Sequence, residues 1–174
     1  MAILPKACTA SKAGLIFCMI LFIAGCASTG KTIVTQKLDR PLSGYENVAV
    51  AVTSELGESG DIELMLEGKI IQKLREIHSL KRVFSYRLSP HEGHDLKVTA
   101  TVTDMVRVSP VERDLLGALA GSGKVVISTE LTDSRRNETI SKFFVQGTAT
   151  MRSSTPQAVR RIAEEIKAYF VQNM

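Results

Sequence analysis

One segment of the sequence, from His94 to Val108, alternates apolar and polar residues with a period of two. As a strand it would place Leu96, Val98, Ala100 and Val102 on one face, and Lys97, Thr99, Thr101 and Thr103 on the other. Such a strand belongs to a sheet that is covered on one face and wet on the other. The rest of the chain must therefore supply helices that cover the apolar face.

Four other segments have the β-branched or aromatic composition of strands, at residues 47–53, 81–88, 124–131 and 138–148. The first of them alternates Val with Ala and is apolar on both faces. This pattern predicts a central position in the sheet, because a central strand can be buried on both sides.

Two segments predict amphipathic helices. Asp61 can cap a helix whose apolar residues recur at helical spacing, namely Ile62, Met65, Leu66, Ile70, Leu74 and Ile77. A second helix begins at Thr155-Pro156, and its apolar stripe consists of Val159, Ile162, Ile166, Tyr169 and Phe170. The resulting order is β-α-β-β-β-β-α. It predicts an α+β two-layer sandwich, a mostly antiparallel sheet of about five strands with two helices on one face.

The N-terminus has the pattern of a secretory signal. Residues 1–12 carry Lys6 and Lys12 and no acid, and residues 13–24 are almost wholly apolar. This run is short for a membrane span, which needs roughly 20 apolar residues. The uncharged residues 27–30 extend it, so an uncleaved anchor remains an alternative.

The octet GCASTGKT, from Gly25 to Thr32, fits two different motifs. It matches the phosphate-binding pattern G-x-x-x-x-G-K-[ST], which needs a strand before it and a helix after it. Here a signal segment precedes it, and a β-branched segment ending at Pro41 follows. The overlapping residues Ile23, Ala24, Gly25 and Cys26 fit a lipobox, the cleavage site of bacterial lipoproteins. We therefore interpret the octet as a lipobox.

By resemblance to lipobox proteins, Cys26 is expected to carry acyl chains that anchor the protein to a membrane. Ala27 follows the cysteine, and the absence of Asp there favours the outer membrane, with the domain facing the periplasm. Residues 1–25 are then a removed signal peptide, 26–43 a lipidated N-terminus with a flexible tether, and 44–174 a single α+β domain. An edge strand at Thr32–Thr35 is the alternative for part of the tether.

Composition excludes several kinds of site. All three cysteines, Cys8, Cys18 and Cys26, fall within the first 26 residues, so the processed chain has one thiol and no intramolecular disulfide or Cys-ligated metal. Without Lys6 and Lys12, its charge is about +2, too small and scattered to indicate nucleic-acid binding. Tryptophan is absent, which weakens the case for an aromatic surface on which bases or sugars could stack.

The remaining candidate sites are weak. GALAGSGK, residues 117–124, fails the P-loop spacing and is interpreted as a loop between strands. Leu115, Leu116 and Leu119 beside it either fold back over the sheet edge or form a partner contact. HEGHD, residues 91–95, could chelate a metal but is better explained as a polar loop. Asp61, Glu63 and Glu67 are best explained as acids near the start of a helix, where they interact favourably with the helix dipole. No catalytic residues, metal or cofactor are expected.

Two stretches carry a family resemblance: RDLLGALAGSGKVVISTELTDSRRNETISKFFVQGTA and TPQAVRRIAEEIKAYF. They resemble a group of bacterial lipoproteins of unknown function, in which a Gly/Ala-rich loop precedes a strand ending in Leu-x-Asp, a turn, a strand and a closing helix. The matching residues are Gly117, Gly121, Leu131, Asp133 and the 158–170 helix. The turn differs from the pattern of the group, because Ser-Arg-Arg-Asn stands where a Gly-containing turn is expected. The group is distantly similar to the amino-terminal domain of the Tol translocation protein.

This resemblance implies a binding or accessory role. We expect a non-enzymatic outer-membrane lipoprotein that binds an envelope partner through a sheet edge or the leucine loop. A module binding a small molecule, glycan or metal is the alternative, and a hydrolase is third.

Overall fold

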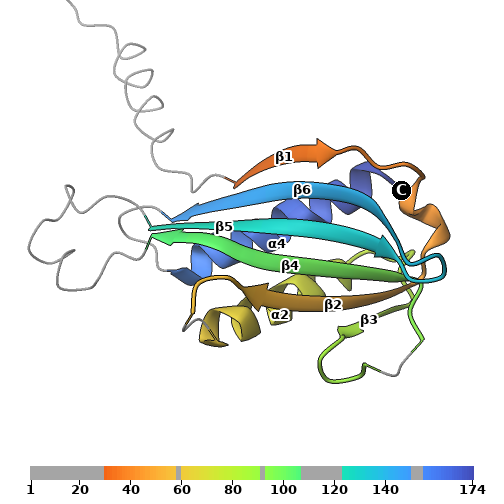
Figure 1. Ribbon diagram of the computed structural model, residues 1–174, viewed down its shortest axis with the longest axis horizontal. Helices are drawn as coiled ribbons and strands as arrows, with labels where there is room; N and C mark the ends of the chain where they lie inside the picture. Colours follow the sequence, from red (N-terminus) through yellow and green to blue (C-terminus); the bar gives the residue numbers. More distant parts are fainter. Residues whose placement is uncertain (1–29, 58–59, 91–92, 107–122, 150–154) are drawn as a thin grey trace, which may run out of the picture.

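The computed structural model describes residues 30–57, 60–90, 93–106, 123–149 and 155–174. They form one six-stranded sheet with two helices packed on a single face (Figure 1). The strands are β1 (Gly30–Gln36), β2 (Asn47–Ser54), β3 (Arg82–Ser85), β4 (Leu96–Val106), β5 (Gly123–Asp133) and β6 (Glu138–Ala149). The helices are α2 (Gly60–Leu74) and α4 (Thr155–Gln172), with a short 3-10 turn at Leu42–Gly44. The predicted α+β two-layer architecture is confirmed.

The strand order in the sheet is β1-β6-β5-β4-β2-β3. β1, β6, β5 and β4 pair antiparallel, whereas β2 is parallel to both of its neighbours, β4 and β3. Parallel neighbours cannot be joined by a tight hairpin, so α2 forms the crossover from β2 to β3. β2 is paired on both sides, as its apolar composition predicted.

The core lies between the sheet and the helices. The apolar stripe of α4 packs onto it, and Val159, Ile162, Ile166 and Phe170 are fully buried. Burying each such side chain contributes about 1.5–3 kcal/mol. Gly147 of β6 lets α4 approach closely, because a Cβ at this position would lie 2.2 Å from the backbone oxygen of Ala158.

The other face of the sheet is open and polar, as the alternating pattern predicted. Along β4 and β5 the residues on this face are partly exposed, and Thr53 and Thr101 are hydrogen-bonded across neighbouring strands at 3.2 Å. Ala49 is an exception and is fully buried. Its partners on the neighbouring strands, Phe84 and Lys97, flank it on this face.

One expectation was wrong. Residues 30–36, assigned to a flexible tether, form β1, which pairs antiparallel with β6 at the sheet edge. The alternative of an edge strand around Thr32–Thr35 is therefore correct for this segment. Leu42, also assigned to the tether, is fully buried. The pattern was misleading because Ile33 and Val34 are both exposed and neither face of β1 is continuously apolar.

Candidate functional site

Asp133, in the Leu-x-Asp stretch at the end of β5, is a buried carboxylate whose side chain is 6% exposed. Its Oδ2 accepts hydrogen bonds from the Tyr45 hydroxyl at 2.9 Å and from Arg40 Nη1 at 3.1 Å. Its Oδ1 accepts the backbone N–H groups of Arg135 and Arg136 at 2.9 and 3.3 Å. Burial alone would raise the pKa of Asp133, but these interactions outweigh it and hold the pKa below its ordinary value.

Asp95 forms a second carboxylate junction beside the first. One oxygen accepts the Nε of Arg135 at 3.1 Å, and the other accepts the backbone N–H and the side-chain amide of Asn47 at 3.2 and 2.9 Å. Burial opposes ionisation here too, but the hydrogen bonds from Arg135 and Asn47 lower the pKa of Asp95. The β5–β6 turn is thereby fastened to the start of β2.

A cavity of about 370 Å³ lies over these junctions. Its lining is Arg40, Pro41, Ser43, Gly44, Tyr45, Asp133, Arg135 and Arg136. Arg40 also reaches Glu138 at 3.3 Å, and Arg135 is paired with Asp95. Because Arg40 and Arg135 already have carboxylate partners, we assign this cavity a structural role in joining segments distant in sequence.

The outer edge of β1 presents an apolar surface. Within the part of the chain that the structure describes, β1 pairs with β6 and its other side has no strand partner (Figure 1). Ile33 is opposite Phe144 in the β1–β6 register, and the two side chains are 51% and 39% exposed. Val34 is turned toward the helix side and is 44% exposed. Exposed apolar residues that gather on a sheet edge are typical of contact surfaces.

A groove separates this edge from α4. It comprises two hollows of about 260 and 490 Å³ that share Thr32, Tyr169 and Gln172 in their lining. Thr32 donates its hydroxyl hydrogen to Glu165 at 2.9 Å, which fixes part of the groove wall. Val34 lies in the larger hollow. The edge and groove together form what we call the β1 surface, defined by Thr32, Ile33, Val34, Phe144 and Tyr169.

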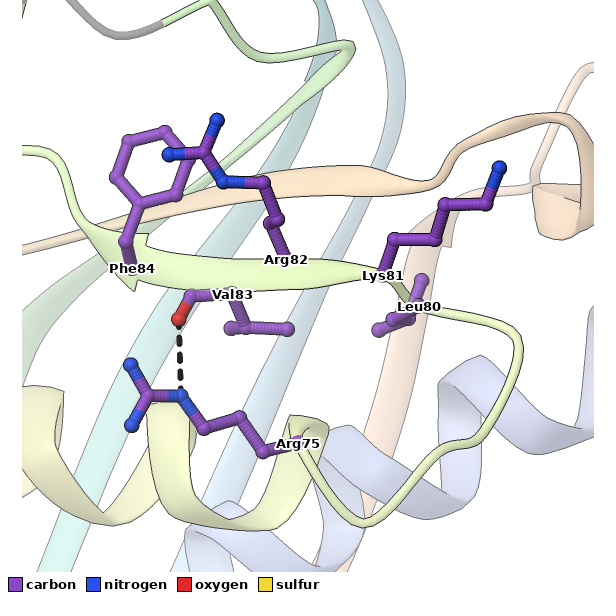
Figure 2. Close-up of a pocket in the computed structure, with 6 residues that line it drawn as sticks. All are labelled: Arg75, Leu80, Lys81, Arg82, Val83 and Phe84. Carbon is purple, nitrogen blue, oxygen red and sulfur yellow. Dashed lines mark hydrogen bonds between the residues drawn. The ribbon is translucent and has the colours of Figure 1, made fainter.

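The opposite edge of the sheet, at β3, has a different character. A cavity of about 430 Å³ is lined there by Arg75, Leu80, Lys81, Arg82, Val83 and Phe84 (Figure 2). Arg75 follows α2 and donates its Nε to the backbone oxygen of Val83 at 3.0 Å. The guanidinium of Arg82 lies over the ring of Phe84, 5.6 Å from its centroid. We call this the β3 cavity.

The sequence-predicted site residues are largely outside the described residues. These are Cys26 and the other lipobox residues Ile23, Ala24 and Gly25, the loop residues Leu115, Leu116 and Leu119, and His91 of the possible metal motif. His94 is described, and it lies edge-on to Tyr86 with ring centroids 5.5 Å apart. No group of three potential metal ligands occurs in the described ranges.

The acids near the start of α2 separate in the structure. Asp61 and Glu63 occupy its first turn, as acids at a helix start should. Glu67, grouped with them in the sequence, is instead buried at 6% exposure. Within the described part of the chain, no helix is both long and apolar enough to cross a membrane.

The sequence predicted a contact through a sheet edge without naming the residues of the β1 surface, and it gave no prediction of the β3 cavity. The run of basic residues around Lys81 and Arg82 was a possible signal for the second. Nothing local indicated that Arg75 would reach Val83, because that contact depends on where α2 ends relative to β3.

No protein-family profile and no curated protein matches this chain. Among solved structures, the chain is similar to PelC from Paraburkholderia phytofirmans, solved as a dodecamer, with 17% identity and a TM-score of 0.61 over 80% of this chain and 96% of PelC. A DUF330 protein from Xanthomonas campestris gives 9% identity and a TM-score of 0.45, covering 80% of this chain and 87% of that one. The likeness to PelC shows that this domain has a fold already seen in a bacterial protein.

Proposed function

We propose that this protein is a lipid-anchored, non-enzymatic component of the bacterial outer membrane that acts by binding in the periplasm. Its first partners are further copies of itself, and the contact is made through the β1 surface. The observation that carries this proposal is the exposed apolar edge of β1, with Ile33 and Phe144 side by side on one face and Val34 on the other.

The unpaired side of β1 supports the proposal that the partner is a protein chain. An edge strand presents backbone N–H and C=O groups that another chain can pair with. Thr32, Ile33 and Val34 are β-branched, a composition that favours strand pairing. The groove beside α4 gives an incoming chain room to bury Val34.

The lipobox supports the membrane anchor. Gly30, the first residue of β1, follows Cys26 by four residues. Four extended residues span at most about 14 Å, so a lipid on Cys26 would hold the β1 edge near the membrane surface. Anchored copies would be confined to a plane, which raises their local concentration and favours assembly.

The PelC likeness supports assembly with copies of the same chain. PelC, which shares the fold, was solved as a dodecamer. The number of copies for the present chain is the quantity to be measured.

Metabolic labelling of cells with a palmitate analogue tests the anchor. The wild-type chain should be labelled and processed, whereas Cys26→Ala should be unlabelled and accumulate as a precursor. Cys18→Ala is the matched control, since Cys18 lies within the leader and should leave labelling unchanged. Unchanged processing of Cys26→Ala would refute the lipoprotein assignment.

Native mass spectrometry of the processed protein in detergent tests the proposed contact between copies through the β1 surface. We expect an oligomer that Ile33→Glu dissociates, lowering the measured mass at least twofold. Leu64→Glu on α2 is the control, because Leu64 is 50% exposed and Ile33 51%. A monomeric wild-type protein, or equal masses for the two variants, would contradict assembly through β1.

A further inference from the structure

We propose that the β3 cavity is a binding site for a phosphate group. It lies at the sheet edge opposite the β1 surface, and the argument for it does not depend on the proposed anchor or assembly. The site combines backbone donors of an edge strand with the cationic side chains of Arg75, Lys81 and Arg82 (Figure 2).

The parallel pairing of β3 determines which backbone groups face outward. Arg82 and Tyr86 donate their backbone N–H groups to Glu46 and Val50, at 3.1 and 2.8 Å. Backbone groups alternate in direction along a strand, so those of Val83 and Ser85 point away from the sheet.

The outward carbonyls of β3 already have donors. Arg75 Nε donates to the oxygen of Val83 at 3.0 Å, and the N–H of Ser89 donates to the oxygen of Ser85 at 3.1 Å. The edge therefore offers the N–H groups of Val83 and Ser85 without a free acceptor beside them. An added strand needs donors and acceptors in alternation, so this edge suits an anion better than a peptide strand.

Arg75 is held so that its remaining donors face the cavity. The bond from Nε to Val83 orients the planar guanidinium beneath β3 (Figure 2). Among the described residues, no carboxylate lies within ion-pair distance of Arg75. The two Nη groups of an arginine can bind two oxygens of one oxyanion, a geometry that phosphate matches.

The local charge is positive. Among the described residues, the cavity lining contains three cationic side chains and no acid. Lys81 pairs with Glu46 at 2.6 Å, but both side chains are largely solvent-exposed, at 69% and 47%, so water screens this pair. The neighbouring acid Glu76 is held by Lys73 and Lys167 at 2.8 and 2.7 Å. The positive charge of Arg75, which has no carboxylate partner among the described residues, is left for a ligand to neutralise.

The volume fits a small ligand or the head of a larger one. About 430 Å³ lies within the range of small-molecule sites, which starts near 300 Å³. A phosphate ester would place its oxygens against Arg75 and the Val83 N–H, and its organic part against Phe84. The phosphate is carried either by a soluble monoester or by a phosphodiester lipid headgroup.

Amide NMR of the full processed chain in detergent tests the site, with inorganic phosphate added at constant ionic strength. Saturable shifts should appear at the N–H of Val83 and Ser85 and at the Nε–H of Arg75. Shifts that stay linear in phosphate concentration, or that occur elsewhere only, would overturn the proposal.

Variants distinguish a specific phosphate site from general electrostatic attraction of phosphate to a basic surface. Arg75→Gln should weaken phosphate binding at least tenfold, and Arg82→Gln about threefold. Arg136→Gln removes the same charge from the other arginine-lined cavity and should bind within twofold of the wild type. Equal binding by all three variants would refute the site. Because Arg82→Gln is an exposed change, a folding defect in Arg75→Gln does not remove the test.

Two soluble probes distinguish the phosphate source. Glycerol 3-phosphate is a monoester, and glycerophosphoglycerol is the diester headgroup of an anionic lipid. Tighter binding of the first would assign a soluble ligand, and tighter binding of the second a lipid headgroup. Failure of both to bind, with no inorganic phosphate binding, would exclude the site while leaving the β1 assembly experiment unaffected.

Discussion

Tyr45 donates its hydroxyl hydrogen to the buried carboxylate of Asp133 across 88 residues of sequence, at 2.9 Å. This bond joins the segment ahead of β2 to the end of β5. Because the Asp133 carboxylate is buried, its hydrogen bonds decide whether it can stay ionised.

Removal of this donor should destabilise the fold. Tyr45→Phe leaves Asp133 with one fewer hydrogen bond in a buried site, and we expect a loss of about 1–3 kcal/mol in the free energy of unfolding. Urea unfolding at pH 7 measures the loss. Tyr86→Phe is the control, because no hydrogen bond to its hydroxyl is described and its stability should change by less than about 0.5 kcal/mol.

The same variant should change acid sensitivity. The folded-state pKa of Asp133 is lowered, so its stabilisation is present above the unfolded-state pKa and is lost as the pH falls through the folded-state value. Loss of the Tyr45 hydrogen bond moves the folded-state pKa upward. The midpoint of acid unfolding, followed by circular dichroism, should therefore shift to higher pH in Tyr45→Phe. An unchanged midpoint would show that other contacts set the ionisation of Asp133.

Glu76 links the two helices electrostatically and should titrate at low pH. Hydrogen bonds from Lys167 and then Lys73 lower its pKa from 4.5 to about 2. The stabilisation that the ionised Glu76 carboxylate gives the fold is present above its unfolded-state pKa, and it is lost as the pH falls toward 2. Carboxyl ¹³C NMR measures this pKa directly. In Lys167→Ala it should rise toward the ordinary value, whereas Lys37→Ala should leave it unchanged.

Gly147 should tolerate no side chain. A Cβ there would lie 2.2 Å from the Ala158 backbone oxygen and 2.9 Å from Ile162 Cγ1, so α4 would have to move. We expect Gly147→Ala to destabilise the protein by about 1–3 kcal/mol or more, measured as a lower thermal midpoint. Gly68→Ala should instead stabilise the protein, raising the free energy of unfolding by about 0.5–1 kcal/mol, because nothing lies within 4 Å of a Cβ on this helical residue.

Asn137 explains how the β5–β6 turn forms without glycine. Its φ is +55°, in the left-handed region that Asn tolerates better than most residues. Asn137→Gly should keep stability within about 0.5 kcal/mol of the wild type, and Asn137→Ala should cost about 1 kcal/mol. Equal losses in the two variants would indicate that the Asn side chain matters more than its backbone conformation.

Elements with a strong local period were predictable from the sequence. β4 alternates from Leu96 to Thr103, and the α4 stripe from Val159 to Phe170 repeats at helical spacing. β1 could not be assigned in the same way, because its stability comes from pairing with β6 more than a hundred residues later. The parallel pairing of β2 with both neighbours was likewise invisible, since the pattern of one strand does not record the direction of the next.

The sites were harder to predict than the fold. Asp133 stood out in the sequence, yet one of its partners, Arg40, lies in the segment predicted as a tether, and the other, Tyr45, lies just after it. Arg75 is an ordinary residue after a helix until β3 is placed beside it. Each contact joins elements that only the completed sheet brings together.

The difference between the two sheet edges bears on fibril formation. Growth of a fibril by strand addition needs a chain with two receptive edges, so that each added copy leaves a new one exposed. Here Arg75 and Ser89 occupy the outward carbonyls of β3, so of the two edges of the described sheet it is β1 that can accept a strand. Pairing of β1 with β1 would consume the receptive edge of both copies and end there. A chain with this arrangement can thus expose a β-branched edge without polymerising through it.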